Sequence, residues 1–117
     1  MKVLVADDEL GLRNLISAVL QEAGHEVVTA NDSRRTVQML SSERPDLLIL
    51  DMMMPGWTGQ QLVNHMDGEL GLNNLPLILM RPGGHLDWLP EGHSPAVTLP
   101  KPFDLQGLLS SVEAVSL

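Results

Sequence analysis

The sequence predicts an α/β fold in which a parallel β-sheet is covered by helices on both faces. Short apolar segments alternate with segments of helical periodicity along the whole 117-residue chain. The central apolar segments lack a polar face, which is typical of strands buried on both sides in a parallel sheet. We therefore expect one domain over residues 1–117, a length sufficient for a single hydrophobic core.

The first third of the chain predicts strand, helix and strand. KVLVA (2–6) is a short valine-rich run followed by acidic residues, which predicts a buried strand. Apolar residues then recur at helical spacing, and Gly24 suits the position that ends such a helix. These apolar residues are Leu12, Leu15, Ile16, Val19, Leu20 and Ala23. HEVVTA (25–30) predicts the second strand.

The middle of the chain repeats this alternation. One of residues 31–33 (Asn, Asp, Ser) can cap a second helix. Its inward-facing residues are expected to be Val37, Met39 and Leu40. DLLIL (46–50) predicts a buried third strand, and residues 60–66 predict a short third helix.

The last third predicts two strands and a final helix around an irregular segment. PLILM (76–80) and AVTL (96–99) predict the strands, and Asp104 suits the N-cap of the helix. The apolar residues of that helix are Leu105, Leu108, Leu109, Val112 and Val115. Residues 81–95 hold three prolines and three glycines where a fourth helix is due. We expect a short or broken helix there, with at most one turn around Leu86 to Leu89.

Composition excludes several classes of protein. The absence of cysteine excludes disulfides, thiolate chemistry and cysteine-bound zinc. A formal charge of −8 with seven Lys and Arg argues against direct nucleic-acid binding. No apolar run is long enough for a membrane span and no signal peptide is evident, so we expect a cytoplasmic protein without a membrane partner.

Charged residues follow three of the predicted strands. Asp7 and Asp8 end the first strand, Asp51 ends the third and Lys101 ends the fifth. Right-handed crossovers place the carboxyl ends of parallel strands on one rim of the sheet, where functional sites form. Three converging carboxylates repel one another unless a cation offsets their charge. Mg²⁺ suits such a site, because it takes one or two carboxylates and leaves room for a phosphate.

Each of these residues also has an ordinary explanation. Asp7 and Asp8 can stabilise a helix N-terminus, Asp51 can end a strand before the Pro55–Gly56 turn, and Lys101 can be a solvated charge. Their joint placement at one rim favours a functional site.

Four stretches in order resemble the signatures of a known family. LVADDE, PDLLILDMMMPGWTG, PLILM and KPFDLQGLL are similar to those of the receiver domain of bacterial two-component response regulators, and the resemblance spans essentially the whole chain. It implies a flavodoxin-like, doubly wound sheet of five parallel strands in the order 2-1-3-4-5.

The resemblance also implies a role for each residue at the rim. Asp51 matches the phospho-accepting aspartate, which takes a phosphoryl group from a histidine kinase. Asp8 matches the direct ligand of Mg²⁺, Asp7 its neighbour that acts through water, and the Met53 backbone carbonyl a further ligand. Lys101 matches the lysine that contacts the phosphoryl group, and the bond to the following proline is cis in the family.

Two positions depart from the family pattern. Arg81 stands where the family has a Ser or Thr hydroxyl, and Thr98 where it usually has an aromatic residue. Arg81 could bind phosphoryl oxygens, because a guanidinium matches phosphate geometry. It could equally pair with Asp51 or Asp8 in the resting protein, or point into solvent.

Three functions follow as hypotheses. The first is a phospho-accepting receiver with no output domain, which signals to a target protein or relays phosphate to a histidine phosphotransfer protein, with only self-phosphotransfer and self-dephosphorylation as its chemistry. The second is a phosphorylation-independent interaction module, because Arg81 and Thr98 replace the usual switch residues. The third, an aspartyl phosphatase, lacks the second acid that such enzymes carry two residues after the nucleophile, where Met53 stands here.

Other residues attract attention for weaker reasons. His85 and His93 lie near acids in the irregular segment, but their spacing fits no zinc site and we expect them to be solvated. Trp57 and Trp88 could anchor a partner, although local packing is the simpler expectation.

Overall fold

The computed structural model describes residues 1–82 and 90–116, and strands alternate with helices as the sequence predicts. The strands are β1 (Lys2–Ala6), β2 (Glu26–Ala30), β3 (Leu47–Asp51), β4 (Leu77–Pro82) and β5 (Val97–Lys101). The helices are α1 (Leu10–Glu22), α2 (Ser33–Glu43), α3 (Gly59–Gly68) and α4 (Leu105–Ser116).

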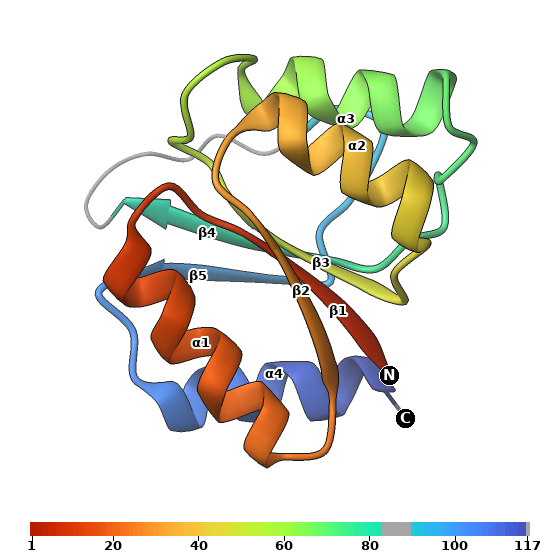
Figure 1. Cartoon of the computed structure of the whole chain (residues 1–117). Coiled ribbons are helices and arrows are strands. Elements are labelled where there is room, and N and C mark those ends of the chain that lie inside the picture. The colour runs from red at the N-terminus through yellow and green to blue at the C-terminus, as the bar shows by residue number, and fades with distance from the viewer. Residues whose placement is uncertain (83–89, 117) are drawn as a thin grey trace.

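The five strands form one parallel sheet in the order β2-β1-β3-β4-β5. Helices α1 and α4 cover one face of the sheet, and α2 and α3 cover the other (Figure 1). The predicted fold class and strand order are therefore confirmed. All strands point the same way, so their carboxyl ends share one rim.

Side chains of each strand alternate between two cores. In β3, Leu48 and Leu50 pack in the core beneath α2 and α3, whereas Leu47 and Ile49 pack in the core beneath α1 and α4. All four side chains are at most 1% exposed, which explains why this segment shows no polar face in the sequence. Burial on both faces fixes the strand, and with it the position of Asp51 at its end.

Local signals define the helix ends. Asp32 accepts a hydrogen bond from the Arg35 backbone N–H at 2.7 Å and caps α2. Thr58 and Gln61 form a reciprocal capping box at the start of α3. Asp104 accepts a hydrogen bond from the Gly107 N–H, as expected for the cap of the last helix.

The structure corrects four details of the predicted elements. Strands β4 and β5 continue beyond the predicted apolar segments, to Pro82 and Lys101, and Lys101 ends β5 as expected. Helix α3 is longer than residues 60–66. Leu15 is 48% exposed and does not face the core. The helical turn expected around Leu86 to Leu89 lies outside the described residues. Among the residues that the structure describes, no helix is long and apolar enough to cross a membrane.

Candidate functional site

Strand register brings three carboxylates together at the carboxyl-end rim. Ala6 of β1 lies opposite Leu50 of β3, so the next residues in the chain, Asp7 and Asp51, end their strands at the same level. Asp7 is fully buried, Asp51 is 4% exposed and Asp8 is exposed. One carboxylate oxygen from each acid lies within 4.8 Å of those of the other two. The structure thus brings together the three acids that the sequence predicts at this rim.

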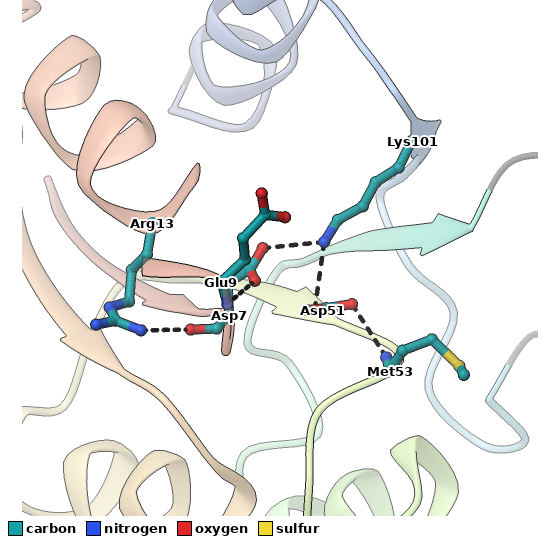
Figure 2. A network of polar contacts seen from close by, with 6 residues as sticks. All are labelled: Asp7, Glu9, Arg13, Asp51, Met53 and Lys101. Atoms are coloured by element: carbon teal, nitrogen blue, oxygen red, sulfur yellow. Dashed lines mark hydrogen bonds and ion pairs between the residues drawn. The ribbon is translucent and has the colours of Figure 1, made fainter. Parts of the chain in front are cut away.

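Lys101 reaches these acids from the far edge of the sheet. Its Nζ lies 3.1 Å from Asp7 Oδ2 and 3.3 Å from Asp51 Oδ2 (Figure 2). The lysine ends β5, and the bond from Lys101 to Pro102 is cis, as the family resemblance implies. One positive charge is therefore placed between two nearly inaccessible negative ones.

Backbone groups hold both buried carboxylates in place. The Glu9 N–H donates to Asp7 Oδ1 at 2.8 Å, and the Met53 N–H donates to Asp51 Oδ1 at 3.0 Å (Figure 2). The Arg13 guanidinium donates to the Asp7 carbonyl oxygen at 2.8 Å and so links α1 to the end of β1. The two backbone N–H groups thus fix one oxygen of each buried carboxylate.

Burial and ion pairing have opposite effects on the pKa values of Asp51 and Lys101. Burial raises the pKa of Asp51, and the charge of Asp7 adds to that rise, while the Met53 N–H and Lys101 oppose it. Burial disfavours the charged form of Lys101, yet the pKa of its ammonium is raised because Asp51 and Asp7 attract the proton. Two carboxylates thus share one lysine, and the site keeps an excess of negative charge.

This donor set fits a hard divalent cation. Carboxylate oxygens are the ligands that Mg²⁺ prefers, and the excess negative charge favours its binding. Asp8 and Asp51 line a cavity of about 680 Å³ together with Lys101, Pro102 and Phe103, and this cavity is wide enough for a cation and a phosphoryl group. Exposed Asp8 lies at this opening and buried Asp51 at its base.

The loop after Asp51 is hydrogen-bonded to the start of α2 through Ser33, which the sequence indicates only as a possible helix cap. Ser33 is 3% exposed, and its hydroxyl lies 3.1 Å from the Pro55 carbonyl oxygen and 3.2 Å from that of Trp57. Gly56 between them has a φ of 102°, and a Cβ there would lie 3.2 Å from the Ser33 Cβ. The position of Ser33 before a predicted helix indicated a possible helix cap, but nothing in the sequence indicated its contact with the loop after Asp51.

The residues at the two atypical positions lie on neighbouring strands. Arg81 is a partly buried residue of β4 opposite Pro100, and Thr98 is a partly buried residue of β5 opposite Leu79. Asp51 forms an ion pair with Lys101. The Met53 N–H bonds to Asp51, and its side chain is 61% exposed and points away from that carboxylate (Figure 2).

The structure overturns one further expectation and leaves another open. His93 is 6% exposed and hydrogen-bonded through both ring nitrogens, so the prediction of a solvated side chain was wrong. His85 and Trp88 lie outside the described residues. Trp57 is 41% exposed and packs on His65 at a ring-centroid distance of 5.1 Å, in line with local packing.

Comparisons with known proteins agree with the fold and identify the family. A family model for the response regulator receiver domain matches residues 3–113. Sporulation initiation phosphotransferase F of Bacillus subtilis (strain 168) is 32% identical over 114 residues, covering 96% of this chain and 90% of that protein. The phosphate regulon transcriptional regulatory protein PhoB of Escherichia coli (strain K12) is 30% identical over 118 residues, and this match covers 97% of the chain but 51% of PhoB.

A solved structure of a response regulator has the same fold as this chain. The chemotaxis response regulator CheY4 of Vibrio cholerae superposes with a TM-score of 0.85 at 29% identity, over 97% of each chain. The family match, the strand order and the acidic rim therefore agree, and the chain belongs to the response regulator receiver domain family of two-component systems.

Proposed function

We propose that this receiver accepts a phosphoryl group on Asp51 in a Mg²⁺-dependent step and signals by contact with a target protein. The observation that carries the proposal is the position of the Asp51 carboxylate, which lies nearly buried in an acidic cavity with the Lys101 amine 3.3 Å from Oδ2. Such an arrangement suits a nucleophile whose product gains negative charge, because a fixed cation is already beside it.

The proposed reaction transfers the phosphoryl group from donor to acceptor without other change. An Asp51 oxygen attacks phosphorus in line, a new O–P bond forms, and the bond from phosphorus to the donor nitrogen breaks. Lys101 stays within reach of the phosphoryl oxygens and offsets their charge. The Met53 N–H keeps the other Asp51 oxygen oriented during attack.

Asp7, Asp8, Asp51 and the Met53 carbonyl are the proposed ligands of Mg²⁺. The three carboxylates support this assignment because their oxygens converge within 4.8 Å. Bound Mg²⁺ would stabilise the charge that develops on the phosphoryl oxygens. The protein's own contribution is to hold these oxygens in place through the bonds from Glu9 and Met53.

The proposed partners are a histidine kinase or histidine phosphotransfer protein as donor and a target protein downstream, in the cytoplasm. Self-phosphotransfer and self-dephosphorylation are the only reactions proposed, so the chain is a phosphoacceptor protein and no enzyme.

Intact mass after incubation with acetyl phosphate and Mg²⁺ tests the proposal. We expect the wild type to gain about 80 Da, the mass of one phosphoryl group, and Asp51→Asn to gain nothing. Chelation with EDTA should prevent the gain. A wild type that stays unmodified with acetyl phosphate and also with a phosphorylated histidine phosphotransfer protein contradicts the proposal.

A second candidate is a phosphorylation-independent interaction module. It is favoured by Arg81 and Thr98, which replace the hydroxyl and the aromatic residue of the family's switch. The Arg81→Thr variant separates the two candidates in the same experiment. A mass gain in Arg81→Thr but not in the wild type would support the module, since the arginine would then prevent acceptance.

A further inference from the structure

Three consecutive methionines follow Asp51, and they differ in their exposure to solvent. Met53 is 61% exposed, whereas Met54 is 9% exposed and Met52 is partly buried against the core beneath α2 and α3. The Met53 side chain extends away from Asp51, with its sulfur near the outer end (Figure 2). The sulfur of Met53 is therefore open to solvent, while those of its two neighbours are largely covered.

The other methionines of the chain are better protected than Met53. Met66 and Met80 are fully buried in the two cores. Met39 and Met1 are partly buried and pack against those cores. All seven methionines lie within the described residues, so Met53 has the most exposed thioether of the chain.

The exposed thioether belongs to a residue whose backbone is part of the site. The Met53 N–H donates to Asp51 Oδ1 at 3.0 Å. Met53 also lines two cavities, the one of about 680 Å³ that contains Asp51 and Lys101 and a second of about 560 Å³ that contains Met52 and Trp57. Because its backbone is hydrogen-bonded to Asp51, a chemical change at the Met53 sulfur takes place at the border of the Asp51 cavity.

An exposed thioether is open to oxidation by peroxides. A sulfur lone pair attacks one oxygen of hydrogen peroxide, an S–O bond forms and the O–O bond breaks. The departing hydroxide takes up the remaining proton and leaves as water, so sulfur is oxidised by two electrons and the peroxide is reduced. The product, methionine sulfoxide, is polar where the thioether was apolar, and methionine sulfoxide reductases convert it back.

We propose that Met53 is a peroxide-sensitive modification site and that its sulfoxide slows phosphorylation of Asp51. The oxidation itself requires only the exposed sulfur, whereas its effect on acceptance rests on the proposed function of Asp51. A sulfoxide oxygen carries partial negative charge. It is added at the border of a cavity where one lysine is shared between two carboxylates, and there it disfavours the approach of an anionic phosphoryl donor.

The first test locates the modification. The folded protein is treated with a small excess of hydrogen peroxide, and each methionine-containing peptide is followed by mass spectrometry for a gain of about 16 Da, one oxygen atom. We expect Met53 to oxidise at least about tenfold faster than Met66 and Met80, because peroxide reaches an exposed sulfur more easily. Treatment in denaturant should remove this difference. Equal rates in the folded protein would overturn the modification site.

The second test measures the consequence for Asp51. Protein that carries one added oxygen is incubated with acetyl phosphate and Mg²⁺, and the rate of its phosphoryl mass gain is compared with that of untreated protein. We expect the rate to fall by about threefold or more, because the anionic donor meets an additional negative dipole. Methionine sulfoxide reductases for both sulfoxide epimers should restore the rate. An unchanged rate in the oxidised protein would overturn the effect on acceptance.

A matched pair of variants assigns the effect to one sulfur. Met53→Leu keeps a similar volume and removes the thioether, so peroxide should no longer change the rate at which this variant is phosphorylated. Met39→Leu alters a methionine of α2 that lines neither cavity, and it should stay as sensitive as the wild type. Each variant is compared with its own untreated sample. Sensitivity that persists in Met53→Leu contradicts the assignment.

Failure of the modification site can be told apart from failure of the proposed function. A wild type that accepts no phosphoryl group before oxidation contradicts the proposed function and, with it, the effect on acceptance. The peptide masses still decide whether Met53 is the oxidation site. Normal acceptance before oxidation, together with equal oxidation of exposed and buried methionines, overturns the modification site and leaves the proposed function standing.

Discussion

At the scale of single residues, the surroundings of Asp51 disfavour its own charge. Burial and the neighbouring Asp7 both raise its pKa, and Lys101 offsets only part of this. Asp51→Asn removes the charge and keeps the shape, so we expect it to raise the Tm of the metal-free protein. Thermal unfolding in EDTA measures this. Asp8→Asn, which alters an exposed acid of the same site, should change Tm much less.

The same residue predicts a pH dependence. Because the pKa of Asp51 is raised in the folded protein, its cost to stability is present only above that pKa and disappears when the carboxyl is protonated. The stability difference between wild type and Asp51→Asn should therefore shrink as pH falls from neutral. Chemical unfolding of both proteins across the acid range tests this. A difference that stays constant or grows in acid would show that charge is not its cause.

Individual site residues differed in how far the sequence could predict them. Asp7, Asp8 and Asp51 were predictable because each follows a buried strand, and parallel strands end at one rim. The roles of Ser33 and His93 were not, because their partners lie 22 and 26 residues away on other elements. Neither distance leaves a periodicity in the sequence that could have indicated it.

At the scale of elements, the loop between β3 and α3 depends on one close contact with the start of α2. Gly56 has a positive φ and would bring a Cβ to 3.2 Å from Ser33. Gly56→Ala should therefore destabilise the protein by about 2–3 kcal/mol, the sum of backbone strain and crowding. Gly24→Ala is the matched control, because Gly24 has a φ of 97° but no atom within 4 Å of the added Cβ.

The difference between the two alanine variants in urea unfolding isolates the contact with Ser33. Equal destabilisation by Gly56→Ala and Gly24→Ala would mean that the loop adjusts and that the contact has no energetic role. A larger loss in Gly56→Ala, accompanied by weaker Mg²⁺ binding, would connect this loop to the geometry of Asp51.

Element boundaries were less predictable than the elements themselves. Strand β4 continues through Arg81 and Pro82 because it pairs with β5 as far as Lys101. Proline suggested a break at this point, but a proline is tolerated at the end of a strand. Leu15 fitted the apolar periodicity of α1 and is nevertheless 48% exposed, since periodicity gives a helix face only approximately.

At the scale of the whole molecule, the fold concentrates uncompensated negative charge at one rim. The proposed binding of Mg²⁺ to the folded state should raise the free energy of unfolding by about 2.7 kcal/mol at a concentration one hundred times the Kd. Asp7→Asn and Asp51→Asn should lose most of this effect, and EDTA should abolish it in the wild type. Asp104→Asn, an acid outside the site, should keep the full response. A response shared equally by all four proteins would indicate unspecific screening.

The global arrangement was the most predictable level of all. Alternation of strand and helix determined the fold class, and the family resemblance added the strand order, both of which the structure confirms. The attachment of surface segments to helices was not predictable. Residues 90–94, for example, are held to α3 by side-chain contacts that leave no pattern in the sequence.

The ion pair between Asp7 and Lys101 has a consequence for protein synthesis. The two residues are 94 positions apart, and their strands are separated in the sheet by β3 and β4. A ribosome that has made the first four strands has already made every acid of the site, but not the lysine. The nascent chain therefore passes through a stage in which Asp7 and Asp51 lack the lysine that pairs with both of them in the finished protein. The ion pairs of the site are thus completed only when the last strand, β5, joins the sheet.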